Sequence, residues 1–223
     1  MTATATASAP ETRAPSQSVI LHNVSWRTYE CLLKDFENSS APRFAYDRGT
    51  LEIMSPLPEH EERNRNIAMI VEIVAEERGL SIRNFGSTTF RQRAALRGFE
   101  PDSCFYIQSA GRLPPRVTRI DLTKDPPPDL VIEIDVTSPS LPKFPLYAQM
   151  SVPEVWRDTD EEVTIFALQD GEFVERRDSV ALPGLTAATL THFVQATATL
   201  ARLEWLRTVR EWARSHPQGP NQA

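Results

Sequence analysis

The stretch DLVIEIDVTSPSLPKFPLY, residues 129–147, begins with the alternation of a buried β-strand but carries a row of acids. Side chains two positions apart share one face of a strand, which places Asp129, Glu133 and Asp135 on the same face. The other face is entirely apolar and consists of Leu130, Ile132, Ile134 and Val136. A buried carboxylate without a partner is costly or becomes protonated, so the acidic face needs a cation, hydrogen-bond donors or water beside it.

Two regions outside this strand are candidates to meet its acids. Asp102 begins the preceding strand-like segment and lies close to Glu133 if the two strands are neighbours. Lys143 and Tyr147 are four residues apart and therefore share one face of the short helix predicted over residues 143–150. A lysine at the start of that helix can reach back to the acids. Each residue also has a simpler interpretation: Asp102 as a turn-forming acid, Lys143 as a solvated lysine and Tyr147 as a packing residue.

Hydrophobic periodicity and turn signals predict the other elements. A helix within residues 22–39 has Ser25 as its cap, and a second helix over residues 59–78 ends at Gly79. The predicted strands and hairpins cover residues 43–54, 80–92, 98–108, 152–158 and 163–177, and an amphipathic helix covers 199–215. This order predicts an α/β fold, in which a mixed sheet is flanked by helices and a β-hairpin is added at each end.

The second predicted helix directs two polar side chains toward the core. Its apolar positions follow the helical period, and extension of that stripe toward the N-terminus places His60 and Asn64 on the inward face. His60 is either part of a site or a capping or satisfied core histidine, and the spacing leaves both interpretations open.

Length and composition limit the class of protein. A chain of 223 residues, with 40% hydrophobic and 24% charged residues, fits one soluble domain with short extensions. The expected organisation is a disordered tail over 1–18, a domain over 19–198, the amphipathic helix over 199–215 and a disordered tail over 216–223. No apolar run approaches the roughly 20 residues that a membrane span requires. Two cysteines, Cys31 and Cys104, are too few for a disulfide framework; this favours the cytoplasm and predicts that both are small core residues.

The charge is unevenly distributed along the chain. A net charge of −6 argues against a nucleic-acid partner, because proteins that bind phosphate usually carry a basic surface. Seven arginines nevertheless lie between Arg83 and Arg119, where there are only two acids before residue 120. They form either a solvated rim or a basic band beside an acidic pocket.

Several short motifs follow one another along the chain: EPD at residues 100–102, PDLVIEI at 128–134, a Lys-x-x-x-Tyr helix over 143–147 and VPEVW at 152–156. Together they resemble a family of restriction endonucleases with the Uma-type domain, which is abundant in cyanobacteria and belongs to the PD-(D/E)XK nuclease superfamily. The resemblance extends over roughly residues 24–175. It implies a restriction-endonuclease-like fold and a metal-dependent endonuclease that hydrolyses DNA phosphodiester bonds with Mg²⁺ or Mn²⁺.

The resemblance also implies roles for individual residues. Asp102 matches the motif aspartate and Glu133 the acid of the last motif; both would bind the metal, with the Ile134 carbonyl as a third ligand. The superfamily pattern has a lysine two residues after this acid, where the present chain has Asp135, so the sequence departs from the pattern there. Members of the family move the lysine to the following helix, and Lys143 is the matching residue.

Two further assignments follow from the same resemblance. His60 matches the histidine that commonly opens the first core helix, and it would position metal-bound water or contact phosphate. Asp135 would either assist metal binding or pair with Lys143. The expected catalytic residues are Asp102, Glu133, Lys143 and His60, and the expected metal ligands are Asp102, Glu133 and Asp135.

Two other functions fit the same sequence. Asp135 in the lysine position and the acidic net charge favour a catalytically inactive nuclease-fold module that binds nucleic acid or a protein partner. In a structural or assembly protein, the acids would simply face solvent at a sheet edge. For the nuclease, the expected partners are DNA and a second copy of the chain, with the helix that carries Trp205 and Trp212 as a contact surface.

Overall fold

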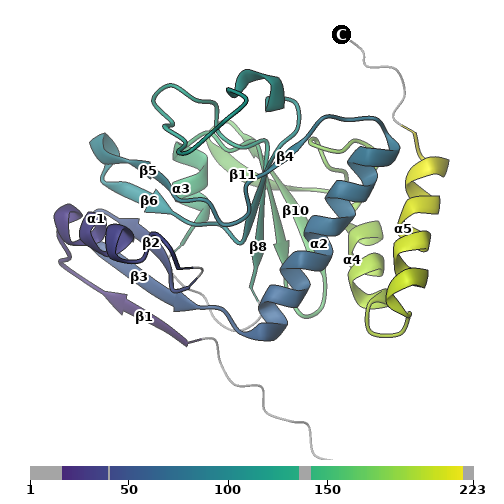
Figure 1. The fold of residues 1–223 in the computed structure, drawn as a ribbon, viewed down its shortest axis with the longest axis horizontal. Helices are drawn as coiled ribbons and strands as arrows, with labels where there is room; N and C mark the ends of the chain where they lie inside the picture. The colour runs from purple at the N-terminus through teal and green to yellow at the C-terminus, as the bar shows by residue number, and fades with distance from the viewer. Residues whose placement is uncertain (1–16, 40, 136–141, 218–223) are drawn as a thin grey trace, which may run out of the picture.

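The chain folds into two β-sheets with helices packed around them (Figure 1). The computed structural model describes residues 17–39, 41–135 and 142–217. The predicted α/β class, with a mixed sheet flanked by helices, is confirmed. The chain forms two sheets, however, where one sheet with added hairpins was expected.

The larger sheet is mixed and has six strands. Strands β8 and β9 run parallel, and the other pairings in this sheet are antiparallel. Strands β10 and β11 form the predicted hairpin, in which the turn residues Asp170 and Gly171 both have positive φ. In spatial order the strands are β11 (Glu172–Arg176), β10 (Val163–Gln169), β9 (Glu154–Asp158), β8 (Leu130–Ile134), β7 (Ser103–Tyr106) and β4 (Arg83–Asn84).

The smaller sheet is antiparallel and contains the first predicted hairpin. Helix α1 (Trp26–Asp35) covers it, because Trp26 and Tyr29 of that helix pack against Tyr46 and Leu51. The hairpin is therefore the centre of a separate sheet and not an addition to the larger one. In spatial order the strands are β1 (Gln17–Leu21), β3 (Thr50–Ser55), β2 (Arg43–Asp47), β6 (Arg97–Phe99) and β5 (Phe90–Gln92).

The helices begin and end close to the predicted positions. Ser25 caps the first helix by accepting a hydrogen bond from the Thr28 N–H at 3.1 Å. The helix over residues 187–196 was not predicted, although Thr186 caps it in the same way. The helices are α1 (Trp26–Asp35), α2 (Pro58–Glu77), α3 (Phe144–Gln149), α4 (Ala187–Ala196) and α5 (Arg202–Ser215), with 3-10 turns η1 (Arg93–Ala95) and η2 (Ala110–Arg112).

Two segments predicted as single strands, residues 80–92 and 98–108, are each divided between the two sheets. The first forms β4 in the larger sheet and β5 in the smaller one, and the second returns through β6 and β7. Gly86 interrupts the first segment with a φ of +53°, a conformation that favours glycine. Pro101 interrupts the second, because proline has no N–H with which to continue a strand ladder. The return crossing thus ends immediately before Asp102.

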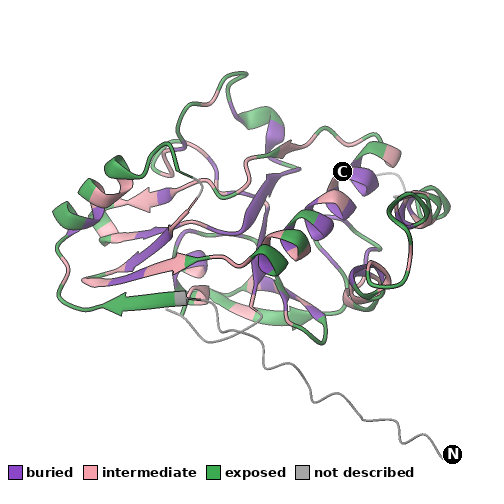
Figure 2. Cartoon of the chain, turned by 60° about the horizontal axis from the view of Figure 1, so that its bottom comes forward, coloured by how far each residue is buried: buried purple, intermediate pink, exposed green. Residues whose placement is uncertain are grey.

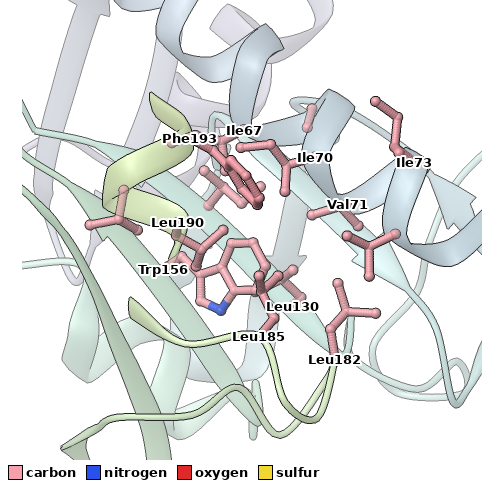
Figure 3. Close-up of a cluster of buried hydrophobic side chains, with 14 of the residues drawn as sticks. Ile67, Ile70, Val71, Ile73, Leu130, Trp156, Leu182, Leu185, Leu190 and Phe193 are labelled. Carbon is pink, nitrogen blue, oxygen red and sulfur yellow. The ribbon is translucent and has the colours of Figure 1, made fainter. Parts of the chain in front are cut away.

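The main core lies between the larger sheet and helices α2, α4 and α5. Figure 3 shows the apolar side chains of α2 opposite Trp156 of β9 and the side chains of α4. The inward stripe predicted for this helix is confirmed, and burial of each large side chain contributes roughly 1.5–3 kcal/mol. The residues drawn and labelled are Ile67, Ile70, Val71, Ile73, Leu130, Trp156, Leu182, Leu185, Leu190 and Phe193.

Helix α5 packs on α2 of the same chain. Trp205 is 1% exposed, and Trp212 packs against the main core. These tryptophans therefore serve the chain's own core, and the use of this helix as a contact surface for a second copy stays a prediction. A homodimer also stays a prediction.

Figure 2 shows that burial is concentrated between the larger sheet and its helices, whereas β1 is exposed.

The structure also bears on the predictions for the two cysteines, the N-terminal tail and a membrane span. Cys104 is buried as predicted, but Cys31 is exposed on α1, so its assignment to the core is wrong. Strand β1 begins inside the tail expected over residues 1–18; residues 1–16 and 218–223 lie outside the described part of the chain. Within the described ranges, each helix is too short or too polar to cross a membrane.

Candidate active site

Two neighbouring strands carry the candidate acids on adjacent segments. Strands β7 and β8 pair antiparallel with Ser103 opposite Ile132, and Asp102 immediately precedes this ladder. Oδ2 of Asp102 also accepts the main-chain N–H of Ile134 at 2.7 Å. The two strands are therefore neighbours, as expected, and Asp102 lies beside the end of β8 that carries Glu133.

The two faces of β8 differ as the alternation predicts. Leu130, Ile132 and Ile134 belong to the main core under α2, whereas Val131 belongs to a second apolar cluster that includes residues of α3. Glu133 shares the face of Val131 and is 7% exposed. Its carboxylate is thus largely removed from water and depends on protein partners.

Glu133 receives two partners from the segment around α3. Lys143 immediately precedes this helix and has its Nζ 2.5 Å from Glu133 Oε2, while the Tyr147 hydroxyl donates to Oε1. Burial, and then the charge of Glu133, raise the pKa of Tyr147 well above its ordinary value of 10.0. The hydroxyl therefore keeps its proton and remains a donor. Lys143 reaches the acid as expected, and Tyr147 fixes the carboxylate as well as packing in the core.

Asp102 is held by a buried arginine to which no motif pointed. Arg43, the first residue of β2, is 6% exposed, and its guanidinium forms ion pairs with Asp102 Oδ1 and with Glu61 of α2. Asp102 itself is 2% exposed. The available sequence signal for Arg43 is weak: a charged residue just before the apolar part of a hairpin strand. Its pairing with Asp102 depends on how the two sheets meet.

The first turns of α2 supply His60 and Asn64 from the inward face, as predicted. His60 Nε2 donates to the Ile134 carbonyl at 2.9 Å and lies 3.3 Å from Asp102 Oδ2, and Asn64 donates to the main-chain carbonyl of Asp102 at 2.9 Å. Burial, and then the charge of Arg43, lower the pKa of His60 to about 4, so the ring is neutral at pH 7. Its Nδ1 is buried and has no hydrogen-bond partner among the described residues.

Asp135 is engaged by the neighbouring strand. Its carboxylate accepts from Arg157 of β9, with Nε at 2.9 Å and Nη2 at 2.6 Å, and its side chain is 28% exposed. The expected alternative of a pair with Lys143 is therefore wrong, because that lysine binds Glu133. Residues 136–141, which connect Asp135 to the segment before α3, lie outside the described residues.

A pocket of about 640 Å³ opens beside Arg43 and Phe44. Its lining includes three further basic side chains, Lys34 of α1, Arg91 of β5 and Arg119 of the loop before β8, and also three acidic ones, Glu30, Glu37 and Glu100. Arg91 and Arg119 belong to the arginine-rich segment, so part of that segment contributes positive charge to the pocket, in line with the basic band. Other arginines of the segment are exposed, in line with the solvated rim.

Other arginines of the same segment have structural partners. Arg83 donates to the Pro114 carbonyl at 2.6 Å, and Arg97 pairs with Asp47 at 2.8 Å. These two side chains fasten loops and strands together and do not contribute free positive charge to the pocket.

Comparison with models of protein families assigns the chain to a family. The family model Uma2, described as "Putative restriction endonuclease", matches residues 26–201, which is more than three quarters of the sequence. The chain belongs to the Uma2 family. This match covers every element from α1 to α4, including both acidic strands and the segment of Lys143, so the family resemblance expected from the motifs is confirmed.

Two other comparisons add little to this assignment. A solved structure similar to this Uma2 chain is that of a "putative nuclease belonging to DUF820" from Anabaena variabilis. It is 19% identical, with a TM-score of 0.47, and the alignment covers 73% of the present chain and 98% of the other. No curated protein matches the sequence.

Proposed function

We propose that this Uma2-family protein is a magnesium-dependent endodeoxyribonuclease that hydrolyses the phosphodiester bonds of DNA. The observation that carries the proposal is the position of Asp102 beside β8, where its carboxylate accepts the Ile134 N–H, while the Lys143 ammonium lies 2.5 Å from Glu133 of the same strand. Two carboxylates on neighbouring segments, with an ammonium group beside one of them, are suited to metal-assisted phosphodiester hydrolysis. The family, described as restriction endonucleases, supports the same reaction.

The donor atoms fit magnesium. Asp102, Glu133 and the Ile134 carbonyl offer oxygen ligands, which Mg²⁺ prefers, and Mg²⁺ usually keeps several waters and adds substrate phosphate to its shell. Among the described residues there is no group of three or more His, Cys, Asp or Glu side chains suited to a metal, so water and phosphate would supply the remaining ligands. Each carboxylate already has a cationic partner, Arg43 or Lys143, and so each position stabilises positive charge.

Residues around the two acids would hold them in the orientation that the reaction needs. The Ile134 N–H and the Asn64 amide fix the side chain and the main chain of Asp102, and the Tyr147 hydroxyl fixes Glu133. Such supporting hydrogen bonds orient metal ligands and tune their basicity.

Lys143 is the residue proposed to act on the attacking water and on the phosphate. Asp102 and Glu133 would hold the magnesium, whose contribution would be Lewis acidity and a lower pKa of a bound water. Lys143, beside Glu133, would orient the attacking water and stabilise the negative charge that develops on the phosphate. His60 is neutral at pH 7 and would keep the Ile134 carbonyl in place through Nε2.

The pocket beside Arg43 is the proposed location of the DNA strand next to the cleaved bond. Lys34, Arg91 and Arg119 line it, and lysine and arginine side chains are the usual partners of backbone phosphates. Four basic side chains line the pocket against three acidic ones, so the pocket has a small excess of positive charge although the whole chain carries a net charge of −6.

Conversion of supercoiled plasmid to nicked or linear DNA tests the function. Wild-type protein is expected to cleave in Mg²⁺ and to stop when the metal is chelated, and both Asp102→Asn and Lys143→Ala are expected to lose at least about 100-fold in rate. Lys124→Ala, which alters a lysine with an 81% exposed side chain, is the matched control and should cleave like wild type. Equal cleavage by all four proteins would identify a contaminating nuclease or a misplaced site.

A catalytically inactive module that binds nucleic acid or a protein is the second candidate function. It is favoured by Asp135, which occupies the usual lysine position and pairs with Arg157, and by the existing neutralisation of both central acids. DNA binding by wild-type protein without cleavage in either Mg²⁺ or Mn²⁺ would support this candidate over the nuclease.

A further inference from the structure

Arg43 connects the acidic site with the neighbouring pocket. Its guanidinium contacts Asp102 and Glu61, and the same residue lines the pocket with the basic side chains. The side chain is 6% exposed, and its Nε has no hydrogen-bond partner among the described residues. The positive charge of Arg43 therefore has two available counter-ions: the carboxylates that it now contacts, and a phosphate that enters the pocket.

A metal ion and Arg43 would compete for Asp102. Oδ2 of this carboxylate accepts the Ile134 N–H and faces His60, and Oδ1 is occupied by the guanidinium. A guanidinium and a divalent cation on the same buried carboxylate repel each other strongly, because little water is present to screen them. Arg43 therefore opposes a metal ion at Asp102, as Lys143 does at Glu133, and withdrawal of the guanidinium would favour metal binding.

The charges of the site favour this exchange when a phosphate is present. Three carboxylates, those of Asp102, Glu133 and Glu61, are paired with two cations, those of Arg43 and Lys143, and the carboxyl group of Glu100 also interacts with both cations. A divalent cation would add two positive charges to this cluster. A phosphodiester group would offset one of them and give the displaced guanidinium a bidentate partner.

We infer that Arg43 is an exchangeable counter-ion. In the metal-free protein it holds Asp102 in place of the metal, and when the metal binds it transfers to the phosphate of the strand in the pocket. The inference rests on the proposed nuclease function. This exchange makes metal binding and DNA binding cooperative. The metal favours the position of Arg43 that binds phosphate, and the DNA phosphate favours the position of Arg43 that leaves Asp102 to the metal.

Titration with Mn²⁺ alone, followed by calorimetry without DNA, tests the competition. Arg43→Gln is expected to bind Mn²⁺ at least about 10-fold more tightly than wild type, because the competing charge is gone. Arg48→Gln, which alters an exposed arginine of the same hairpin, is the matched control and should leave the affinity unchanged. Unchanged or weaker Mn²⁺ binding by a folded Arg43→Gln protein overturns the inference, since a purely structural arginine would give that result.

Arg43→Lys provides the second variant if the glutamine variant does not fold. A single ammonium keeps the charge but lacks the guanidinium fork that contacts Asp102 and Glu61 together. This variant is expected to bind Mn²⁺ more tightly than wild type, by a smaller factor than Arg43→Gln. Wild-type affinity in the folded lysine variant also overturns the inference.

Cleavage separates this inference from the proposed function. At saturating metal, Arg43→Gln is expected to cleave plasmid about 100-fold more slowly than wild type despite its tighter metal binding, because a phosphate partner is lost. Tighter metal binding with no cleavage by wild type would refute the nuclease and retain the competition. Tighter metal binding with wild-type cleavage by Arg43→Gln would refute the transfer to phosphate.

Discussion

Glu133→Gln is expected to slow Mg²⁺-dependent DNA cleavage by at least about 100-fold and to weaken Mn²⁺ binding. Glutamine has the same shape but no charge, so it removes one of the two proposed metal carboxylates while Tyr147 can still donate to the amide oxygen. The Lys143 ammonium loses its counter-ion at the same time. Single-turnover cleavage of a labelled DNA duplex measures the loss.

Glu175→Gln is the matched control, because Glu175 is an exposed acid of β11 away from the acidic pair. Thermal unfolding of all three proteins separates a folding defect from a chemical one. Wild-type cleavage by a folded Glu133→Gln protein would show that this carboxylate has no role in the reaction, and would remove the main support for the proposed mechanism.

The stability of the metal-free protein is expected to fall as His60 becomes protonated. Burial and the charge of Arg43 lower its pKa from 6.5 to about 4 in the folded state. The folded state therefore gains stability from neutral His60 above pH 6.5, and this gain is lost as pH falls toward 4. A difference of 2.5 pKa units at 1.36 kcal/mol each corresponds to about 3 kcal/mol.

Urea unfolding of wild type and His60→Gln between pH 7.5 and 4 measures this contribution. Wild type is expected to lose about 3 kcal/mol more than the variant over the lower part of this range. Burial raises the pKa of Glu100, Glu154 and Asp158, which gives the opposite slope, but these groups are common to both proteins. Parallel stability curves would mean that His60 is accessible to protons in the folded state.

Local patterns predicted those features of the site that depend on one segment at a time. The alternation in residues 129–136 correctly separated Glu133 from the apolar face of β8, and the helical period correctly turned His60 and Asn64 inward. The position of Lys143 at the start of a helix was sufficient to bring it back to Glu133. Each inference used a spacing of two, three or four residues, which backbone geometry fixes.

Features that depend on contacts between distant segments could not be predicted. Arg43 meets Asp102 because the chain crosses between two sheets near Gly86 and Pro101, and no periodicity encodes how the sheets meet. The same limitation explains why a single sheet was expected. Asp135 was expected to pair with Lys143 or to assist metal binding; the parallel pairing of β8 with β9 provides Arg157 in place of Lys143, and the metal-binding role stays a prediction.

The central claim is that Asp102 and Glu133 share one divalent cation. Crystals grown with Mn²⁺ and a short DNA duplex, measured at the manganese absorption edge, test it most directly. The account predicts an anomalous peak within bonding distance of one carboxylate oxygen from each residue, with the Arg43 guanidinium turned away from Asp102 toward a phosphate. A peak held by other residues, or none in crystals of protein that cleaves DNA with Mn²⁺, would contradict it.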